Sequence, residues 1–586
     1  MITKLNLDEG GHHPDVPDGD SAAHGHALSL YGSIAGQIAV GRYLLHIGEP
    51  FGGLVEEASR AQANLIRPRP TPILLRPGSP RGLIDRQDDL TSALSAVDAG
   101  LSIEVTGAPG VGKTAFLHQL AHHSGAAAFA DGVAYIAARH QSSADILQLI
   151  FEAFYETDQV CKPTVAEIRL ALEDKQALIL LDDVQLARNE MEEVLDVAPR
   201  SALALTTRER CLAGELRGLV LEGLPTREAV MLLEREVGRS LSVSERTPAA
   251  GLCATIAGHP LRIRQAAAII RERGIAMDVL VRDIAPENLI TELMASTDEK
   301  QRRALLALAA AAGVPMQVQH ISGLAEVTDI EPSLASLVGR GLVVRGQSRY
   351  RLVDGVANHL RGTQDLKPWV NRTITYFTAW AERYRRSPNT LMEESEALLR
   401  AQQYACDAQR WGEVLRLGQL VEAALVLGAR WGAWAITLER CLAAAKAIRD
   451  RSVEAWALHQ SGTRALCLGE TAVARALLTQ AVTLREAMED SDAIAASRRN
   501  LSFVLAPVAI ASRERETTRF DDVVDLDSLP LRYEMQPAAR VARSTGASAI
   551  LLVTLLLVTL GGLAYWAGQS ELLWKSWEGA GRPQVL

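Results

Sequence analysis

The sequence is poor in cysteine, in aromatic residues and in net positive charge. Its 586 residues include six cysteines and no Cys-x-x-Cys pair, which disfavours a disulfide framework and a cysteine-type zinc site. Acidic residues outnumber basic ones by 70 to 61, and a net charge of −9 disfavours a globally basic nucleic-acid binder. Aromatic residues make up 5%, hydrophobic residues 48% and charged residues 22%. This balance indicates a globular, helix-rich protein and excludes long-range disorder.

The N-terminal region has no basic segment followed by an apolar one, so no signal peptide is expected. Further along, apolar strands alternate with helices and then give way to helices alone, which predicts an α/β domain with a parallel sheet followed by helical modules. The predicted parts are a disordered tail (1–27), a short β-rich segment (28–66), a Pro-rich linker (67–80), a P-loop NTPase domain (81–280), a winged helix (281–365), TPR-like helical repeats (366–510), a tether (511–546), a transmembrane helix (547–567) and a short tail (568–586).

A long uncharged run lies near the C-terminus. Residues 547–567 read ASAILLVTLLLVTLGGLAYWA, and 21 helical residues rise roughly 31 Å, about the thickness of a bilayer core. Tyr565 and Trp566 stand near one edge, where amphipathic rings favour the interface. We therefore expect a single-pass membrane protein with the bulk of the chain cytoplasmic and a short external C-terminal tail.

A complete phosphate-binding motif follows the first strand of the α/β region. It has the form GxxxxGK[ST] between the strand LSIEVT and a helix, which is the context that the motif requires. Glycines let successive N–H groups face one centre, and the helix N-terminus adds positive potential there. Lys113 can reach the β- and γ-phosphates, and the Thr114 hydroxyl can bind Mg²⁺. The expected nucleotide-binding residues are Gly107, Ala108, Pro109, Gly110, Val111, Gly112, Lys113 and Thr114.

A second motif supports the first. The apolar run LILL (178–181) ends in Asp182 and Asp183, and the carboxyl ends of parallel strands face the ligand crevice. Asp182 is then placed to bind Mg²⁺, directly or through water. Asp183 could orient or deprotonate the attacking water. A slow ATPase with Lys113, Asp182 and Asp183 in its catalytic centre is therefore expected.

Taken in order, these motifs resemble the NB-ARC domains of the STAND class of signal-transducing P-loop NTPases. The resemblance covers roughly residues 78–365. Besides the two Walker motifs, it is carried by Leu83-Ile84-Asp85-Arg86, Asp131-Gly132-Val133-Ala134-Tyr135, Thr206-Thr207-Arg208, the segment 219–224 and Gly258-His259-Pro260-Leu261.

The resemblance implies further roles. Arg208 would act as a sensor toward the γ-phosphate, and Pro260 would lie against the base or sugar and help to hold ADP. It also implies ATP rather than GTP. Many members carry Met-His-Asp in the winged helix, where the His contacts the ADP β-phosphate. Here the matching stretch is Leu352-Val353-Asp354, and valine cannot make that hydrogen bond. Either this protein holds its ADP-bound off state differently, or the alignment is shifted. His359 is not at the position expected for the histidine of the family.

The expected function is a membrane-anchored STAND switch: off with ADP, on as an oligomer with ATP and Mg²⁺, and reset by slow hydrolysis. A protein or ligand at the helical repeats would be the trigger, and the role would lie in bacterial defence or stress signalling. The membrane helix would be either the effector or a passive anchor. One alternative is a membrane-tethered transcription regulator that binds DNA through Arg340, Arg345, Arg349 and Arg351, although nucleic acid is the less favoured partner. Another is a nucleotide-dependent scaffold without useful hydrolysis.

Overall fold

The computed structural model describes residues 36–505, apart from 41–42, 48–51, 58–65, 79–83, 85, 124–125, 127, 158–160, 213–215 and 284. The chain divides into two units, Met1–Ala509 and Ile510–Leu586. The predicted tail 1–27, the tether 511–546, the membrane span 547–567 and the tail 568–586 lie outside the described residues. Among the helices that the structure does describe, none is both long and apolar enough to cross a bilayer.

The first described element is a three-stranded antiparallel sheet. Leu45 lies opposite Ile38 on one side and Val55 on the other, and all three are buried. The sheet packs on the last helices that the structure describes, where Val55 N donates to Asn500 Oδ1 (3.0 Å). A sheet of this size cannot bury a core alone, so the C-terminal helices complete it. Its strands are β1 (Gly36–Val40), β2 (Tyr43–Ile47) and β3 (Leu54–Glu57).

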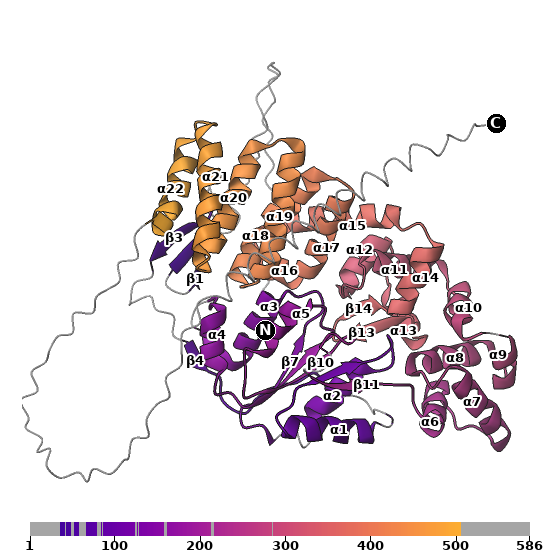
Figure 1. The fold of residues 1–586 in the computed structure, drawn as a ribbon. Helices are drawn as coiled ribbons and strands as arrows, with labels where there is room; N and C mark the ends of the chain where they lie inside the picture. Colours follow the sequence, from indigo (N-terminus) through magenta and orange to yellow (C-terminus); the bar gives the residue numbers. More distant parts are fainter. Residues whose placement is uncertain are drawn as a thin grey trace, which may run out of the picture. The chain divides into compact units, whose positions relative to one another are not determined.

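The NTPase domain is built on a six-stranded parallel sheet in the order β11-β6-β10-β9-β7-β5. One hydrophobic cluster joins the sheet to α1 and α2, and a second joins its other face to α3, α4 and α5 (Figure 1). The predicted parallel-sheet P-loop domain is confirmed. Its elements are α1 (Gln87–Asp98), β6 (Ile103–Thr106), α2 (Lys113–His122), β7 (Gly132–Ala137), α3 (Ser143–Phe154), α4 (Val165–Leu172), β9 (Ala177–Asp182), α5 (Arg188–Leu195), β10 (Ala202–Thr206) and β11 (Arg217–Val220).

The Pro-rich segment 67–80, predicted as a linker, contributes to this domain and corrects that prediction. Strand β5 (Ile73–Leu75) is the edge strand of the sheet and pairs in parallel with β7. Strand β4 (Ile66–Pro68) pairs with β8 (Tyr155–Thr157). Prolines are tolerated at sheet edges, which is where both short strands lie.

Helices and then a winged helix follow the sheet. The first group comprises α6 (Thr226–Val237), α7 (Val243–Thr255), α8 (Pro260–Arg273), α9 (Met277–Asp283), η3 (Pro286–Asn288) and α10 (Leu289–Ala295). In the winged helix, β14 pairs with β12 and β13 in an antiparallel sheet. Its elements are α11 (Glu299–Ala310), β12 (Met316–Gln317), α12 (Val318–Ala325), α13 (Glu331–Gly339), β13 (Val343–Gly346), β14 (Arg349–Leu352) and α14 (Asp354–Thr363).

From residue 367 onward the described chain is helical, and the predicted helical-repeat region is confirmed. The pair Leu427-Gly428 recurs 41 residues later as Leu468-Gly469, a weak internal repeat in the sequence. Both pairs lie at helix ends, since Gly428 is the C-cap of α18 and Leu468 is the C-cap of α20. The helices are α15 (Lys367–Arg383), α16 (Pro388–Glu393), α17 (Ser395–Asp407), α18 (Trp411–Leu427), α19 (Trp431–Ile448), α20 (Arg451–Cys467), α21 (Thr471–Glu486) and α22 (Ser491–Leu505).

Candidate functional site

The phosphate-binding loop connects β6 to α2 and has left-handed backbone at three glycines. Gly107, Gly110 and Gly112 have φ values of +145°, +89° and +109°. A Cβ on Gly107 would lie 2.5 Å from the carbonyl oxygen of Leu221, so neither the torsion nor the space admits a larger residue. The loop therefore has the backbone curl that a phosphate cradle requires.

Lys113 is the first residue of α2 and folds back onto the loop. Its Nζ donates to the carbonyl oxygen of Gly107 (2.6 Å) and to that of Ala108 (3.4 Å). Burial lowers the pKa of this amine, while the nearby carboxylates of Asp183 and Asp182 raise it. A phosphate in the cradle would give the ammonium a stronger partner than these neutral carbonyls.

Asp182 ends β9 and is the centre of a hydroxyl network. Its Oδ1 accepts from Thr114 Oγ1 (3.1 Å) and Thr206 Oγ1 (2.7 Å), and its Oδ2 accepts from Tyr135 OH (3.0 Å). Burial and the Asp182 carboxylate raise the pKa of Tyr135, so its hydroxyl stays protonated. Thr114 and Asp182 offer the oxygen donors that Mg²⁺ prefers. These two residues fit the predicted metal site, where Mg²⁺ would neutralise phosphate charge.

Asp183 forms an ion pair with Arg139, the second residue after β7. Its backbone is left-handed, with φ at +58°, and its N–H donates to Thr206 Oγ1 (2.7 Å). In this arrangement Arg139 engages the Asp183 carboxylate, and the predicted role of Asp183 toward the attacking water stays a prediction.

The segment Gly258–Leu261 lies against the phosphate-binding loop. His259 is the N-cap of α8, and its Nε2 lies 3.1 Å from the carbonyl oxygen of Pro109. A Cβ on Gly110 would lie 2.7 Å from Leu261 Cδ2. Pro260 is the first residue of α8, a position that suits its fixed φ. The structure thus places Pro260 next to the loop, and its predicted contact with the base or sugar stays a prediction.

The winged helix reaches the same site through Asp354. Asp354 is the first residue of α14. Its Oδ2 lies 3.3 Å from Nη2 of Arg208, which follows the end of strand β10. Val353 is 6% exposed within the hydrophobic core and cannot reach a ligand with its side chain. Asp354 is therefore the member of the Leu352-Val353-Asp354 stretch that connects to the NTPase domain.

A second winged-helix residue, Arg351, adds positive charge here. Burial and the neighbouring Arg139 lower its pKa, while Asp354, Asp183 and Asp182 raise it. The site therefore alternates cations and carboxylates drawn from two domains. Sequence reasoning missed Arg139, which enters the site by following a strand at the carboxyl edge of the sheet. The position of Arg139 directly after a predicted strand could have indicated this, because the carboxyl ends of parallel strands face the ligand crevice.

Comparisons with known proteins agree with this geometry. Residues 85–242 match the family described as the NB-ARC domain, which supports the P-loop NTPase domain predicted from the motifs. A comparison with curated proteins gives no match.

Solved structures match this chain at low identity and low TM-score. A Signal Transduction ATPase with Numerous Domains with a tetratricopeptide repeat sensor, from Pyrococcus horikoshii, is 14% identical, with 73% of this chain and 81% of that chain covered and a TM-score of 0.38. A Walker-type ATPase of Pyrococcus abyssi is also 14% identical, with 49% and 99% covered and a TM-score of 0.26.

Proposed function

We propose that this chain is a nucleotide-dependent signalling switch of the STAND class. ADP holds the NTPase domain and the winged helix together, and ATP with Mg²⁺ separates them and permits self-association. Slow hydrolysis then resets the chain. The observation that carries the proposal is the Arg208–Asp354 ion pair (3.3 Å), which joins the predicted γ-phosphate sensor to the winged helix.

The ion pair gives a physical reason for nucleotide dependence. Arg208 can pair with Asp354 or with a γ-phosphate oxygen, and these two anions compete for one guanidinium. ADP lacks that phosphate and leaves Asp354 in place. ATP draws Arg208 away and also brings negative charge close to the Asp354 carboxylate. Such a difference in interaction between two states is what a ligand needs to shift their populations.

The first experiment identifies the nucleotide that the protein carries. The full chain is purified without added nucleotide and denatured, and the released material is analysed by chromatography. Near-stoichiometric ADP supports the switch. An empty protein that binds ATP and ADP equally well contradicts it, because a ligand with equal affinity for both states shifts nothing.

We also propose a membrane location for the chain, carried by the uncharged segment 547–567. The helical repeats would receive the trigger, and the membrane segment would serve either as output or as anchor, with the bulk of the chain cytoplasmic. Extraction of membranes at high pH tests this location. Release of the full chain into the soluble fraction would rule out a spanning segment.

The two alternatives make different demands on the structure. For a DNA regulator, the arginines of the wing have to be available, yet Arg349 pairs with Glu394 (2.8 Å) and Arg340 with Glu272 (2.8 Å). Arg345 lies over the Tyr350 ring (5.7 Å) and has no carboxylate partner among the described residues. DNA binding would thus require two internal ion pairs to break. Duplex binding in low salt that charge reversal of Arg345 and Arg349 abolishes would favour this alternative.

A scaffold without useful hydrolysis is tested by separating binding from chemistry. Lys113→Ala removes the phosphate-binding ammonium, and Asp183→Asn removes the expected base. The switch predicts that both variants change signalling. A normal reset after Asp183→Asn, together with complete loss after Lys113→Ala, would favour the scaffold.

A further inference from the structure

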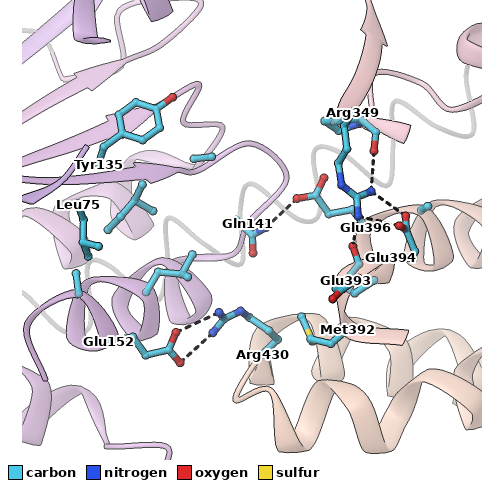
Figure 2. A pocket seen from close by; sticks show the side chains of 17 residues that line it. Leu75, Tyr135, Gln141, Glu152, Arg349, Met392, Glu393, Glu394, Glu396 and Arg430 are labelled. Carbon is cyan, nitrogen blue, oxygen red and sulfur yellow. Dashed lines mark hydrogen bonds and ion pairs between the residues drawn. The ribbon is translucent and has the colours of Figure 1, made fainter. Parts of the chain in front are cut away.

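Two adjoining cavities open between the NTPase domain and helices α16 to α19. Their volumes are about 510 Å³ and 250 Å³, and both are lined by Gln141, Met392, Ser395, Glu396 and Arg430. Figure 2 shows the larger one, with Gln141 of the NTPase domain facing Glu396 across it. The two cavities therefore adjoin each other at the junction of two parts of the chain.

The charges around the larger cavity are paired with one another. Arg349 forms a bidentate pair with Glu394, with both N–O distances at 2.8 Å. Arg430 likewise contacts both oxygens of Glu152, at 3.3 and 3.2 Å (Figure 2). These pairs hold the walls of the cavity together and leave little unbalanced charge for a ligand.

The smaller cavity has two arginines with no carboxylate partner. Arg440 of α19 donates to the carbonyl oxygen of Leu399 (3.0 Å) and to Gln402 Oε1 (3.4 Å), which are neutral acceptors. Arg400 of α17 makes no ion pair within the described part of the chain. Burial and the nearby Arg400 lower the pKa of the Arg440 guanidinium, while Cys406 and Asp407 raise it. Two neighbouring partly buried cations without an ion-pair partner repel each other, and an anion between them would relieve the repulsion.

The remaining walls of the smaller cavity are largely apolar. The apolar part is formed by Val314, Met392, Leu399, Leu425, Ala433 and Ile436, and the carboxylates of Asp145 and Glu396 also line the cavity. Both carboxylates already have donors, because Asp145 accepts from two backbone N–H groups of α19 and Glu396 accepts from Gln141. The volume lies just below the roughly 300–1,000 Å³ of most ligand sites, so the space suits a small occupant. Apolar walls with a pair of arginines fit a molecule that has one anionic group and an apolar body.

The NTPase side of the smaller cavity is connected to the catalytic centre. It includes His140, a non-glycine residue in left-handed backbone with φ at +59°. Burial and the nearby Arg400 lower the pKa of His140 to about 4, so the ring is neutral at physiological pH. The residue before it is Arg139, which holds Asp183. An occupant would therefore contact the loop that positions this carboxylate.

We propose that the cavity between His140, Arg400 and Arg440 is a regulatory site for a small organic anion with an apolar body. The cavity exists only while the NTPase loop that contains His140 contacts the helices. A ligand that binds in the cavity therefore stabilises this contact by linkage. The binding site itself depends only on the cavity. The regulatory effect rests on the proposed function, and it consists of slower exchange of bound ADP.

Binding is tested on the full chain with 4-(trifluoromethyl)benzenesulfonate, observed by fluorine NMR. We expect saturable binding that weakens at least tenfold in Arg400→Gln and further in the double variant with Arg440→Gln. Arg449→Gln, at the exposed end of α19, is the matched control and should leave binding unchanged. The neutral sulfonamide analogue should bind at least tenfold more weakly than the sulfonate.

Three results would overturn the assignment of the site: no binding at millimolar sulfonate, equal binding by the double variant while it keeps its thermal midpoint, or equal binding of the sulfonamide. Regulation is measured separately, as release of a fluorescent ADP analogue with and without the sulfonate. Unchanged release with binding intact overturns the regulatory effect alone. A chain that holds no ADP and binds ATP and ADP equally well contradicts the proposed function, whereas the binding result stands.

Discussion

Asp145 of the NTPase domain accepts hydrogen bonds from the first turn of the distant helix α19, which begins at Trp431. Its Oδ1 accepts a hydrogen bond from the backbone N–H of Gly432 (3.0 Å), in the first turn of α19. Its Oδ2 accepts from the N–H of Ala433 (2.9 Å) and from Ser142 Oγ (2.9 Å). Asp145 is 1% exposed, so these N–H groups have no water to replace it. The cap makes the start of α19 dependent on contact with the NTPase domain.

Removal of this cap should weaken the contact between the NTPase domain and α19. Asp145→Ala leaves buried N–H groups without an acceptor, and we expect a loss of about 1–3 kcal/mol in the free energy of unfolding. Because the lost contact joins two domains, release of bound ADP should accelerate as well. Denaturant unfolding and the release of a fluorescent ADP analogue measure the two effects.

The matched control is Asp450→Ala. Asp450 caps α20 by accepting from Val453 N (3.0 Å), and both groups belong to the helical region. Its removal should lower stability and leave ADP release unchanged. If the two variants accelerate ADP release equally, the interdomain cap does not contribute to the switch.

Asp145 also shows what the sequence could and could not predict. The phosphate-binding loop and Asp182 were predictable because a short motif fixes their local backbone and role. Asp145 stands three residues after Ser142 at the start of α3, which locally indicates only an ordinary helix beginning. Its actual partners come from a distant helix, and no local pattern encodes that pairing.

Two other features were missed for related reasons. The strand β5 has only three residues and follows a proline, so the composition of its surroundings indicated a linker. The Arg139–Asp183 pair requires knowledge of how two strand ends meet, since each residue alone is compatible with a solvent-exposed position. The sequence predicted that Val353 cannot make the histidine contact of the family, but it did not indicate that the neighbouring Asp354 pairs with Arg208.

The Asp182 carboxylate should be needed for metal-dependent binding. Asp182→Asn keeps an oxygen that can accept from Thr114 and Thr206, so folding should be little affected. Loss of the negative charge should reduce the Mg²⁺-dependent gain in ATP affinity at least tenfold, about 1.4 kcal/mol. Calorimetric titrations with ATP in Mg²⁺ and in EDTA measure this gain.

Thr114→Ser is the control for that experiment, because it retains the hydroxyl that contacts Asp182. It should keep most of the Mg²⁺ effect. An Asp182→Asn protein that responds to Mg²⁺ as the unchanged protein does would show that this carboxylate does not support the metal.

The Arg208–Asp354 pair should affect nucleotide exchange more than stability. The Arg208 side chain is 50% exposed, and such pairs are typically worth about 0–1 kcal/mol. Asp354→Asn should therefore shift the thermal midpoint little and speed ADP release by up to about fivefold, the equivalent of about 1 kcal/mol. A double-mutant cycle with Arg208→Gln isolates the pair from the other effects of each substitution.

A comparable exposed pair that stays within one helix provides the control. Arg302 and Glu299 lie 3.2 Å apart on α11 and are 51% and 68% exposed. Arg302→Gln should leave ADP release unchanged. Additive effects of Arg208→Gln and Asp354→Asn would mean that the two residues do not act through each other.

Glu422 should make stability fall as the pH rises. This residue of α18 accepts from Trp434 Nε1 (3.3 Å) and from the Gln460 side chain, and burial raises its pKa to about 8. The folded protein therefore holds a proton that the unfolded chain loses near pH 4.5, so stability is lost between about pH 4.5 and 8. The slope is at most about 1.4 kcal/mol per pH unit.

Glu422→Gln keeps an oxygen for both donors and removes the titration. The stability gained by this substitution should be small near pH 5 and should grow up to pH 8, as measured by denaturant unfolding. His459 acts in the opposite direction, because burial lowers its pKa to about 3 and its contribution is lost as the pH falls below about 6.5. The unchanged protein and the Glu422→Gln variant share that loss, so the difference between their free energies of unfolding reports on Glu422 alone. The control is Glu439→Gln, at an exposed position on α19, and its effect on stability should not grow with pH. A pH-independent gain in stability for Glu422→Gln would mean that Glu422 is already ionised in the folded protein.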